Sequence, residues 1–258
     1  MKEQKNEVVT KQNSEVANQE ENVLMGFENT DMGEMTLARA KLMQTTSTEV
    51  EDGDARPGQV IHDALLMDLA DGDGNYIFIP IAFSDGRILL KPKNEPLPAE
   101  MDGDLFNLDS DVVCRSANGK EAMNGLSCAS CPYGKWNGNR PPLCNDMTNV
   151  LALFGEDTIP VVLTFMKTSA KYGKKFKKMA IYAAQKAGGA LFRLKFKLTV
   201  KKEQNDKGNF FTYSAKPCGN TSEDEYGRAL AAYKQFANID VGFNVTSDEE
   251  GVEGPTEY

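Results

Sequence analysis

The hydrophobic positions of this chain fall mainly into short apolar runs and alternating stretches, two patterns typical of β-strands. Dense apolar runs at residues 76–83 and 158–165 each predict a strand. Residues 84–86 are Ser-Asp-Gly, which favours a turn, so residues 87–91 are predicted to return as the partner strand of a hairpin. The cleanest alternation, at residues 191–201, predicts a strand with one apolar face and one basic face.

Two further stretches have helical periodicity. In residues 168–187, apolar positions recur every three or four residues, and Gly188-Gly189 ends the pattern. Residues 223–236 predict a second, shorter helix. Between the helices, a turn at residues 205–208 and an aromatic-rich stretch at 209–216 give the alternating strand a hairpin partner.

The same pattern divides the chain into three parts. Residues 1–22 are polar and mixed in charge, and they predict a disordered arm. Residues 23–245 contain the apolar runs and predict a single domain, with an inserted cysteine-bearing element at about 112–146. Residues 246–258 form an acidic tail without apolar anchors, which we expect to be flexible.

Charge changes this picture because it is unevenly distributed. The chain has a formal net charge of -9, yet residues 167–202 contain eleven Lys, one Arg and no Asp or Glu. A basic segment with interleaved aromatic residues is typical of proteins that bind single-stranded nucleic acid, because phosphates pair with lysines and bases stack on rings. The acidic tail is predicted to compete for this basic surface and to contact partner proteins.

The candidate nucleic-acid ligands combine the basic residues of the helix and strand with nearby aromatic residues. The alternative interpretation is a solvated basic face and aromatic residues buried in the core, and we expect half or more of the aromatic residues to be core. The candidates are Lys171, Lys174, Lys175, Lys178, Arg193, Lys195, Lys197, Lys201, Phe210, Phe211, Tyr213 and Trp136.

Four of the five cysteines are candidate metal ligands. Cys114, Cys128, Cys131 and Cys144 have the spacing C-x13-C-x2-C-x12-C, in segments too polar to form a core of their own. Four thiolates suit a closed, structural zinc site. An iron–sulfur cluster uses the same ligands, and unrelated thiols are the third alternative. Cys218 is left over as a spare thiol.

Other features favour a non-catalytic, cytoplasmic protein. The single histidine, His62, excludes most histidine-based catalysis, and no phosphate-loop, nucleophile-elbow or zinc-protease motif is present. The N-terminus lacks the apolar stretch of a signal peptide, and no run of 18 apolar residues predicts a membrane-spanning helix. We therefore expect the thiols to be reduced.

The segments MGFENT…LARAKLMQ, SCASCPYGKW…PLC and LTFMKTSAKYGKKF, together with the basic aromatic sheet and the acidic tail, give the chain an organisation that resembles the single-stranded DNA-binding proteins of tailed bacteriophages. The resemblance covers roughly residues 23–258. It implies a mainly β (α+β) fold, an OB-like antiparallel barrel with an inserted four-cysteine zinc element and a few flanking helices. The best-known phage member has a histidine among its zinc ligands, whereas here all the candidates are cysteines.

The resemblance also implies function. Such a protein coats single-stranded DNA without catalysis, largely independently of sequence, and contacts replication or recombination proteins in the host cytoplasm. RNA is a second possible ligand of the same surface. The alternative is a protein-interaction module, a phage regulator whose basic face docks on host transcription or replication machinery. A metal-dependent nuclease is disfavoured because the chain has no suitable cluster of Asp, Glu and His.

Overall fold

The structure is a computed structural model that describes residues 37–91, 106, 111–138, 141–205 and 208–237. All of these residues belong to the second of two units, residues 36–258. The predicted N-terminal arm, residues 1–22, and the predicted acidic tail, residues 246–258, lie outside the described residues.

The described residues form nine strands, three α-helices and three short 3-10 helices. The strands are β1 Arg39–Leu42, β2 Val60–His62, β3 Met67–Asp68, β4 Tyr76–Leu90, β5 Val112–Ser116, β6 Cys144–Phe154, β7 Val161–Met166, β8 Leu194–Asn205 and β9 Gly208–Asn220. The α-helices are α1 Thr48–Glu51, α2 Ala170–Lys186 and α3 Glu223–Phe236, and the 3-10 helices are η1 Pro132–Gly134, η2 Lys167–Ser169 and η3 Leu191–Arg193.

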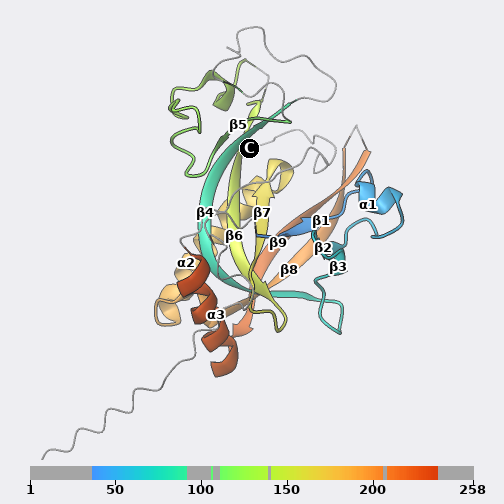
Figure 1. The fold of residues 1–258 in the computed structure, drawn as a ribbon, viewed down its shortest axis with the longest axis vertical. Coiled ribbons are helices and arrows are strands. Elements are labelled where there is room, and N and C mark those ends of the chain that lie inside the picture. Colours follow the sequence, from blue (N-terminus) through green and yellow to red (C-terminus); the bar gives the residue numbers. More distant parts are fainter. Residues whose placement is uncertain (1–36, 92–105, 107–110, 139–140, 206–207, 238–258) are drawn as a thin grey trace, which may run out of the picture. The chain divides into compact units, whose positions relative to one another are not determined.

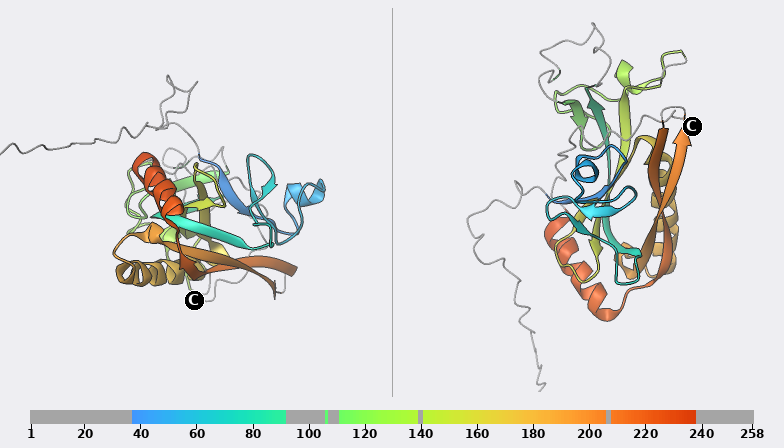
Figure 2. Two further views of the ribbon diagram at one scale, coloured as in Figure 1. Left: turned by 90° about the horizontal axis from the view of Figure 1, so that it is seen from below. Right: turned by 90° about the vertical axis from the view of Figure 1, so that its right-hand side faces the viewer.

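All the described strands belong to one sheet in the order β3-β2-β1-β7-β6-β4-β8-β9, with β5 paired to β4 (Figure 1). The sheet curls, so that β9 at one end of this order approaches β1 near the other (Figure 2). Side chains bridge the two edges. The Gln44 amide accepts from the Phe211 backbone N–H and donates to its carbonyl, and the Tyr213 hydroxyl donates to the Thr164 carbonyl.

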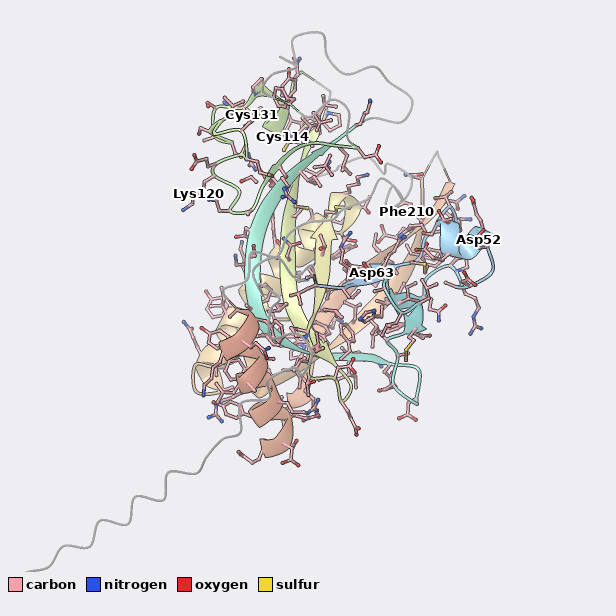
Figure 3. All side chains as sticks on the ribbon, in the orientation of Figure 1. Asp52, Asp63, Cys114, Lys120, Cys131 and Phe210 are labelled. Atoms are coloured by element: carbon pink, nitrogen blue, oxygen red, sulfur yellow. The ribbon has the colours of Figure 1, made fainter. Side chains whose placement is uncertain are left out.

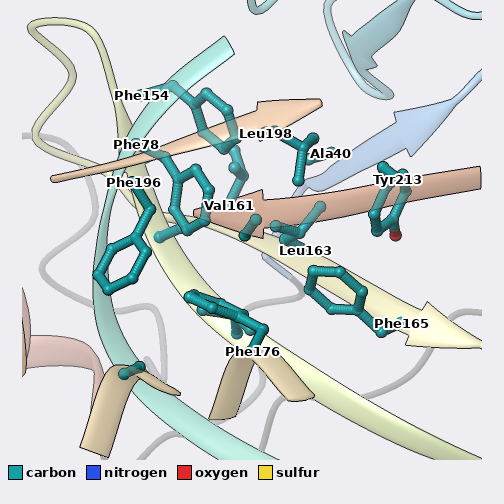
Figure 4. Close-up of a cluster of buried hydrophobic side chains, with 14 of the residues drawn as sticks. Ala40, Phe78, Phe154, Val161, Leu163, Phe165, Phe176, Phe196, Leu198 and Tyr213 are labelled. Atoms are coloured by element: carbon teal, nitrogen blue, oxygen red, sulfur yellow. The ribbon is translucent and has the colours of Figure 1, made fainter. Parts of the chain in front are cut away.

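The main core lies between the curled sheet and one face of α2 (Figure 4). Phe176 of α2 is 4.9 Å from the ring of Phe196 and 5.8 Å from those of Phe78 and Phe165, measured between centroids. Each of these four rings is fully buried. Burial of such a side chain contributes about 1.5–3 kcal/mol to the free energy of folding. Tyr213 meets Phe165 edge-on at 4.8 Å, so β9 closes the same core.

The two long helices agree with the sequence predictions. The apolar face of α2 is formed by Ala170, Gly173, Phe176, Ala180 and Ala184. Helix α3 begins with a complete capping box, in which the Ser222 hydroxyl accepts from the Glu225 N–H and the Glu225 carboxylate accepts from the Ser222 N–H. The predicted hairpin of residues 191–201 and 209–216 is confirmed as β8 and β9, except that Leu191–Arg193 form η3 rather than strand and both strands extend past their predicted ends.

The predicted hairpin at residues 76–91 is wrong. Instead, β4 runs without a turn through all 15 residues, with one irregularity in its pairing with β6 near Pro80 and Ala82. Asp85 and Gly86 lie inside the strand opposite Thr148 and Met147. The long strand β6 supplies hydrogen-bond partners along this stretch, and this regular pairing overrides the local turn preference of Ser-Asp-Gly.

The prediction of a mainly β fold with a few helices is confirmed, with a barrel-like curled sheet. The sheet is mixed rather than antiparallel throughout, because β1 pairs with β7 in parallel. The predicted zinc element is not shown, since among the described residues no three His, Cys, Asp or Glu side chains are arranged to hold a metal ion.

Candidate nucleic-acid interface and cysteine cavity

Helix α2 presents an exposed ridge that we call the α2 ridge. It follows the helical spacing i, i+4, i+7, i+11 and i+15 on the side opposite the core. Tyr182 is 69% exposed in the middle of it, four residues from a lysine on either side. The ridge consists of Lys171, Lys175, Lys178, Tyr182 and Lys186, all exposed.

The lysines beside the ridge are held by acidic residues from the sheet. Lys174 forms an ion pair with Asp146 of β6 at 2.8 Å, and Lys177 forms one with Asp85 of β4 at 2.5 Å. Burial alone would raise the pKa of Asp146, but the hydrogen bond from Lys174 and the charges of Lys174 and Arg87 lower it below its ordinary value. These pairs fix α2 on the sheet and leave the α2 ridge facing outward.

No acidic side chain of the described residues pairs with Lys175, Lys178 or Lys186. The Lys171 ammonium lies 5.3 Å from the centroid of the Tyr172 ring, an aromatic contact that leaves its positive charge intact. The α2 ridge is therefore a concentrated positive surface with one exposed aromatic ring, which is suited to a strand of phosphates and bases.

The predicted basic face of β8 is partly paired with other elements and otherwise exposed. Lys195 pairs with Glu225 of α3 at 3.0 Å, and the Arg193 guanidinium lies 4.5 Å from the centroid of the Tyr226 ring. Lys197 donates to the Asn75 side chain, and Arg193, Lys197 and Lys201 are all exposed. The basic segment contains no acids of its own, but folding brings α3 against it.

Two of the predicted stacking residues are buried. Phe210 and Tyr213 are 6% and 5% exposed, so neither ring has a free face on which a base could stack. Phe211 is half-buried, and its ring lies against Gly58, where a Cβ atom would be 2.8 Å away. All three rings line a groove of about 70 Å³ between β1, β7 and β9, together with Arg39 and Lys167.

Trp136 is 50% exposed and lies five residues after Cys131. Cys131 and Phe210 lie in different parts of the structure, so the predicted aromatic residues do not form one surface (Figure 3). Tyr182, by contrast, was not among the sequence-predicted candidates. Its signal was available in the sequence, because it falls on the lysine side of the predicted helix rather than on the apolar side.

The four candidate metal ligands line one small cavity of about 20 Å³, with Leu89 and Phe106 among its other walls. Cys114 of β5 and Cys144 of β6 both pair with Leu89 of β4, so the three residues form one row across the sheet. Cys131 and Cys128 come from the intervening segment, and Cys131 lies near Cys114 in Figure 3.

Burial and the neighbouring thiols raise the pKa values of two cysteines around this cavity. Burial, followed by the nearby Cys131, raises the pKa of Cys144 to about 12, and the same two causes raise the pKa of Cys114. Lining a common cavity is a weaker condition than ligation, which requires four sulfur atoms about 2.3 Å from one point. The structure therefore gathers the four side chains without placing them as a ligand set. Cys218 is exposed on β9 and does not line the cavity.

Together these observations define a mainly β protein with a curled mixed sheet, a basic helical ridge and a four-cysteine cavity. A family model described as Pam3 phage gp34-like protein matches residues 4–241, and the chain belongs to this family. The family name indicates a bacteriophage context. Comparison with curated proteins and with solved structures gave no match. None of the described helices has the length and apolarity needed to cross a membrane.

Proposed function

We propose that this protein binds single-stranded DNA through the α2 ridge, without catalysis and largely independently of sequence. The observation that carries the proposal is the row of exposed lysines that no described acid neutralises, with Tyr182 exposed among them. Its role would be to coat single strands during phage replication or recombination. That part rests on the resemblance of the sequence and on the phage name of the family.

The proposed mechanism has two steps. The lysines of the α2 ridge first attract the phosphate backbone and release its condensed counterions, which lowers the logarithm of the binding constant by about 0.7 per contacted phosphate for each tenfold rise in salt. A base then stacks on the ring of Tyr182, which is already exposed to solvent. Neither step reads a base edge, so the binding discriminates strand geometry more than sequence.

The test is a titration of the full chain with labelled single-stranded and blunt double-stranded oligonucleotides at two salt concentrations. The variant Lys175→Glu/Lys178→Glu should bind the single strand at least tenfold more weakly, which corresponds to about 1.4 kcal/mol or more. A matched control is Arg56→Glu/Lys234→Glu, which reverses two exposed charges outside α2 and should change the affinity less than twofold.

Equal loss of affinity in both double variants would reduce the effect to net charge and contradict the assignment to α2. Equal affinity for duplex and single strand, or binding that does not respond to salt, would contradict the mechanism. Absence of binding to either oligonucleotide would favour the alternative, in which the basic surface docks on an acidic protein.

A further inference from the structure

The segment between β5 and β6 folds without a core of its own. Of its described residues, 117–138 and 141–143, only Ala122 and Cys128 are buried. Met123 and Trp136 are 70% and 50% exposed, and the half-buried Tyr133 packs edge-on against Phe106 outside the segment. Apolar burial therefore contributes little to its order, and some other interaction must offset the entropy lost on folding.

Backbone anchors hold this segment close to the sheet. The Arg87 guanidinium donates to the Cys128 carbonyl at 3.1 Å and pairs with Asp146 at 2.9 Å. Gly134 leaves room for this approach, because a Cβ atom there would make a tight contact of 3.1 Å with the Arg87 guanidinium nitrogen. These contacts fix the backbone beside Cys128 and bring Cys128 and Cys131 over the row formed by Cys114, Leu89 and Cys144.

The cavity has room for one ion. A space of roughly 10–15 Å³ holds one water molecule, and this cavity measures about 20 Å³. Cys114 and Cys144 flank Leu89, and their backbones lie about two interstrand spacings apart, or roughly 9–10 Å. Their thiols must lean toward each other over Leu89 to reach a common ion, and the cavity is the space that this movement would fill.

We propose that Cys114, Cys128, Cys131 and Cys144 bind one zinc ion, which orders the segment between β5 and β6. The four thiolates would fill the coordination sphere and leave no open position for a substrate, so the ion has a structural role. This inference is independent of DNA binding. It concerns the opposite end of β6 from the main core, and it is tested without nucleic acid.

The first test measures metal content in the full chain purified under reducing conditions. The wild type and the control Cys218→Ser should each contain about one equivalent of zinc, and Cys131→Ser should contain less than half. Cys218 provides a matched control because it is exposed on β9, away from the cavity. Less than half an equivalent of zinc in the wild type, or iron in its place, would overturn the proposal.

The second test needs no variant and so does not depend on the folding of one. The native chain is treated with a thiol-alkylating reagent, with and without a strong zinc chelator, and the labels are counted by mass spectrometry. One label, on Cys218, is expected without chelator, and five with it. Emission from Trp136, the sole tryptophan, should shift on chelation. The same number of labels with and without chelator, or a disulfide among the four cysteines, would contradict the proposal.

Discussion

Gly173 allows α2 to pack closely against strands β6 and β7 of the sheet. A Cβ atom at this position would overlap the Phe165 side chain and lie 3.1 Å from the Thr148 Cβ. Glycine in a helix interior costs roughly 0.5–1 kcal/mol relative to alanine, so its presence here reflects the close packing of helix on strand rather than local helix preference.

We expect Gly173→Ala to lower the free energy of unfolding by about 1–3 kcal/mol, because the helix must move away from Phe165. Gly227→Ala in α3 is the control, since no atom lies within 4 Å of its added methyl group. That change should raise stability by roughly 0.5–1 kcal/mol. Urea denaturation compares the two, and a Gly173→Ala protein as stable as the wild type would contradict the close packing.

Tyr182 provides a residue-scale test of the proposed DNA interface. Tyr182→Ala should weaken single-strand binding by about 1 kcal/mol or more, roughly fivefold in Kd, whereas Tyr182→Phe should bind nearly as the wild type does because the ring remains. Fluorescence anisotropy gives both values. If the two variants bind equally well, the ring does not stack on a base.

At the scale of elements, α3 is fastened at its first turn by Glu225. Burial would raise the pKa of this carboxyl, but the hydrogen bond from the Ser222 N–H and the pairing with Lys195 outweigh burial and lower it. A carboxyl whose folded-state pKa is depressed stabilises the fold above its unfolded-state pKa, near 4.3, and loses that contribution as the pH falls through the folded value.

We therefore expect Glu225→Gln to lower the free energy of unfolding by about 0.5–1 kcal/mol at pH 6, and the deficit to shrink toward zero near pH 3. The control Glu223→Gln lies in the same turn, is exposed, and should show a smaller deficit at pH 6. Thermal unfolding at the two pH values measures the effect. A deficit that persists undiminished at pH 3 would show that the charge of Glu225 is not its source.

The elements with a strong local signal were predictable from sequence, namely α2, α3 and the β8–β9 hairpin. The strands at residues 76–83 and 87–91 were also predictable, but their continuity as β4 was not, because the pairing with β6 comes from residues about 60 positions away and no local pattern encodes it. The contacts of Lys195 and Arg193 on β8 could not be predicted for a related reason, since Glu225 and Tyr226 reach them only after folding. The aromatic-rich strand β9 was predicted, but Phe210 and Tyr213 lie on opposite faces of it and both are buried.

At the scale of the whole molecule, the chain combines a net charge of -9 with one concentrated basic segment. Residues 248–258 carry five acidic residues, and they belong to the tail predicted from sequence. A tethered polyanion has an effective concentration on the order of millimolar near its target, and we expect this tail to compete with DNA for the α2 ridge.

Truncation after Thr246 should therefore tighten single-strand binding, most clearly at low salt, where charges are least screened. A matched control keeps the length and replaces the tail acids with their amides, and it should tighten binding to a similar degree. The measurement is the affinity of the wild type and of both variants for single-stranded DNA at two salt concentrations. Unchanged affinity in both variants at low salt would show that the tail does not compete.

The parallel pairing of β1 with β7 has a consequence for the synthesis of the chain. Arg39 pairs with Val162, so β1 leaves the ribosome long before the strand that completes its hydrogen bonding. Until then the β1–β2 pair has one open edge, a recognised starting point for aggregation, and the pairing that closes it is non-local and slow to form. We therefore expect nascent chains arrested before residue 161 to depend most on chaperones, and rapid translation through β7 to shorten the time for which the β1 edge stays open.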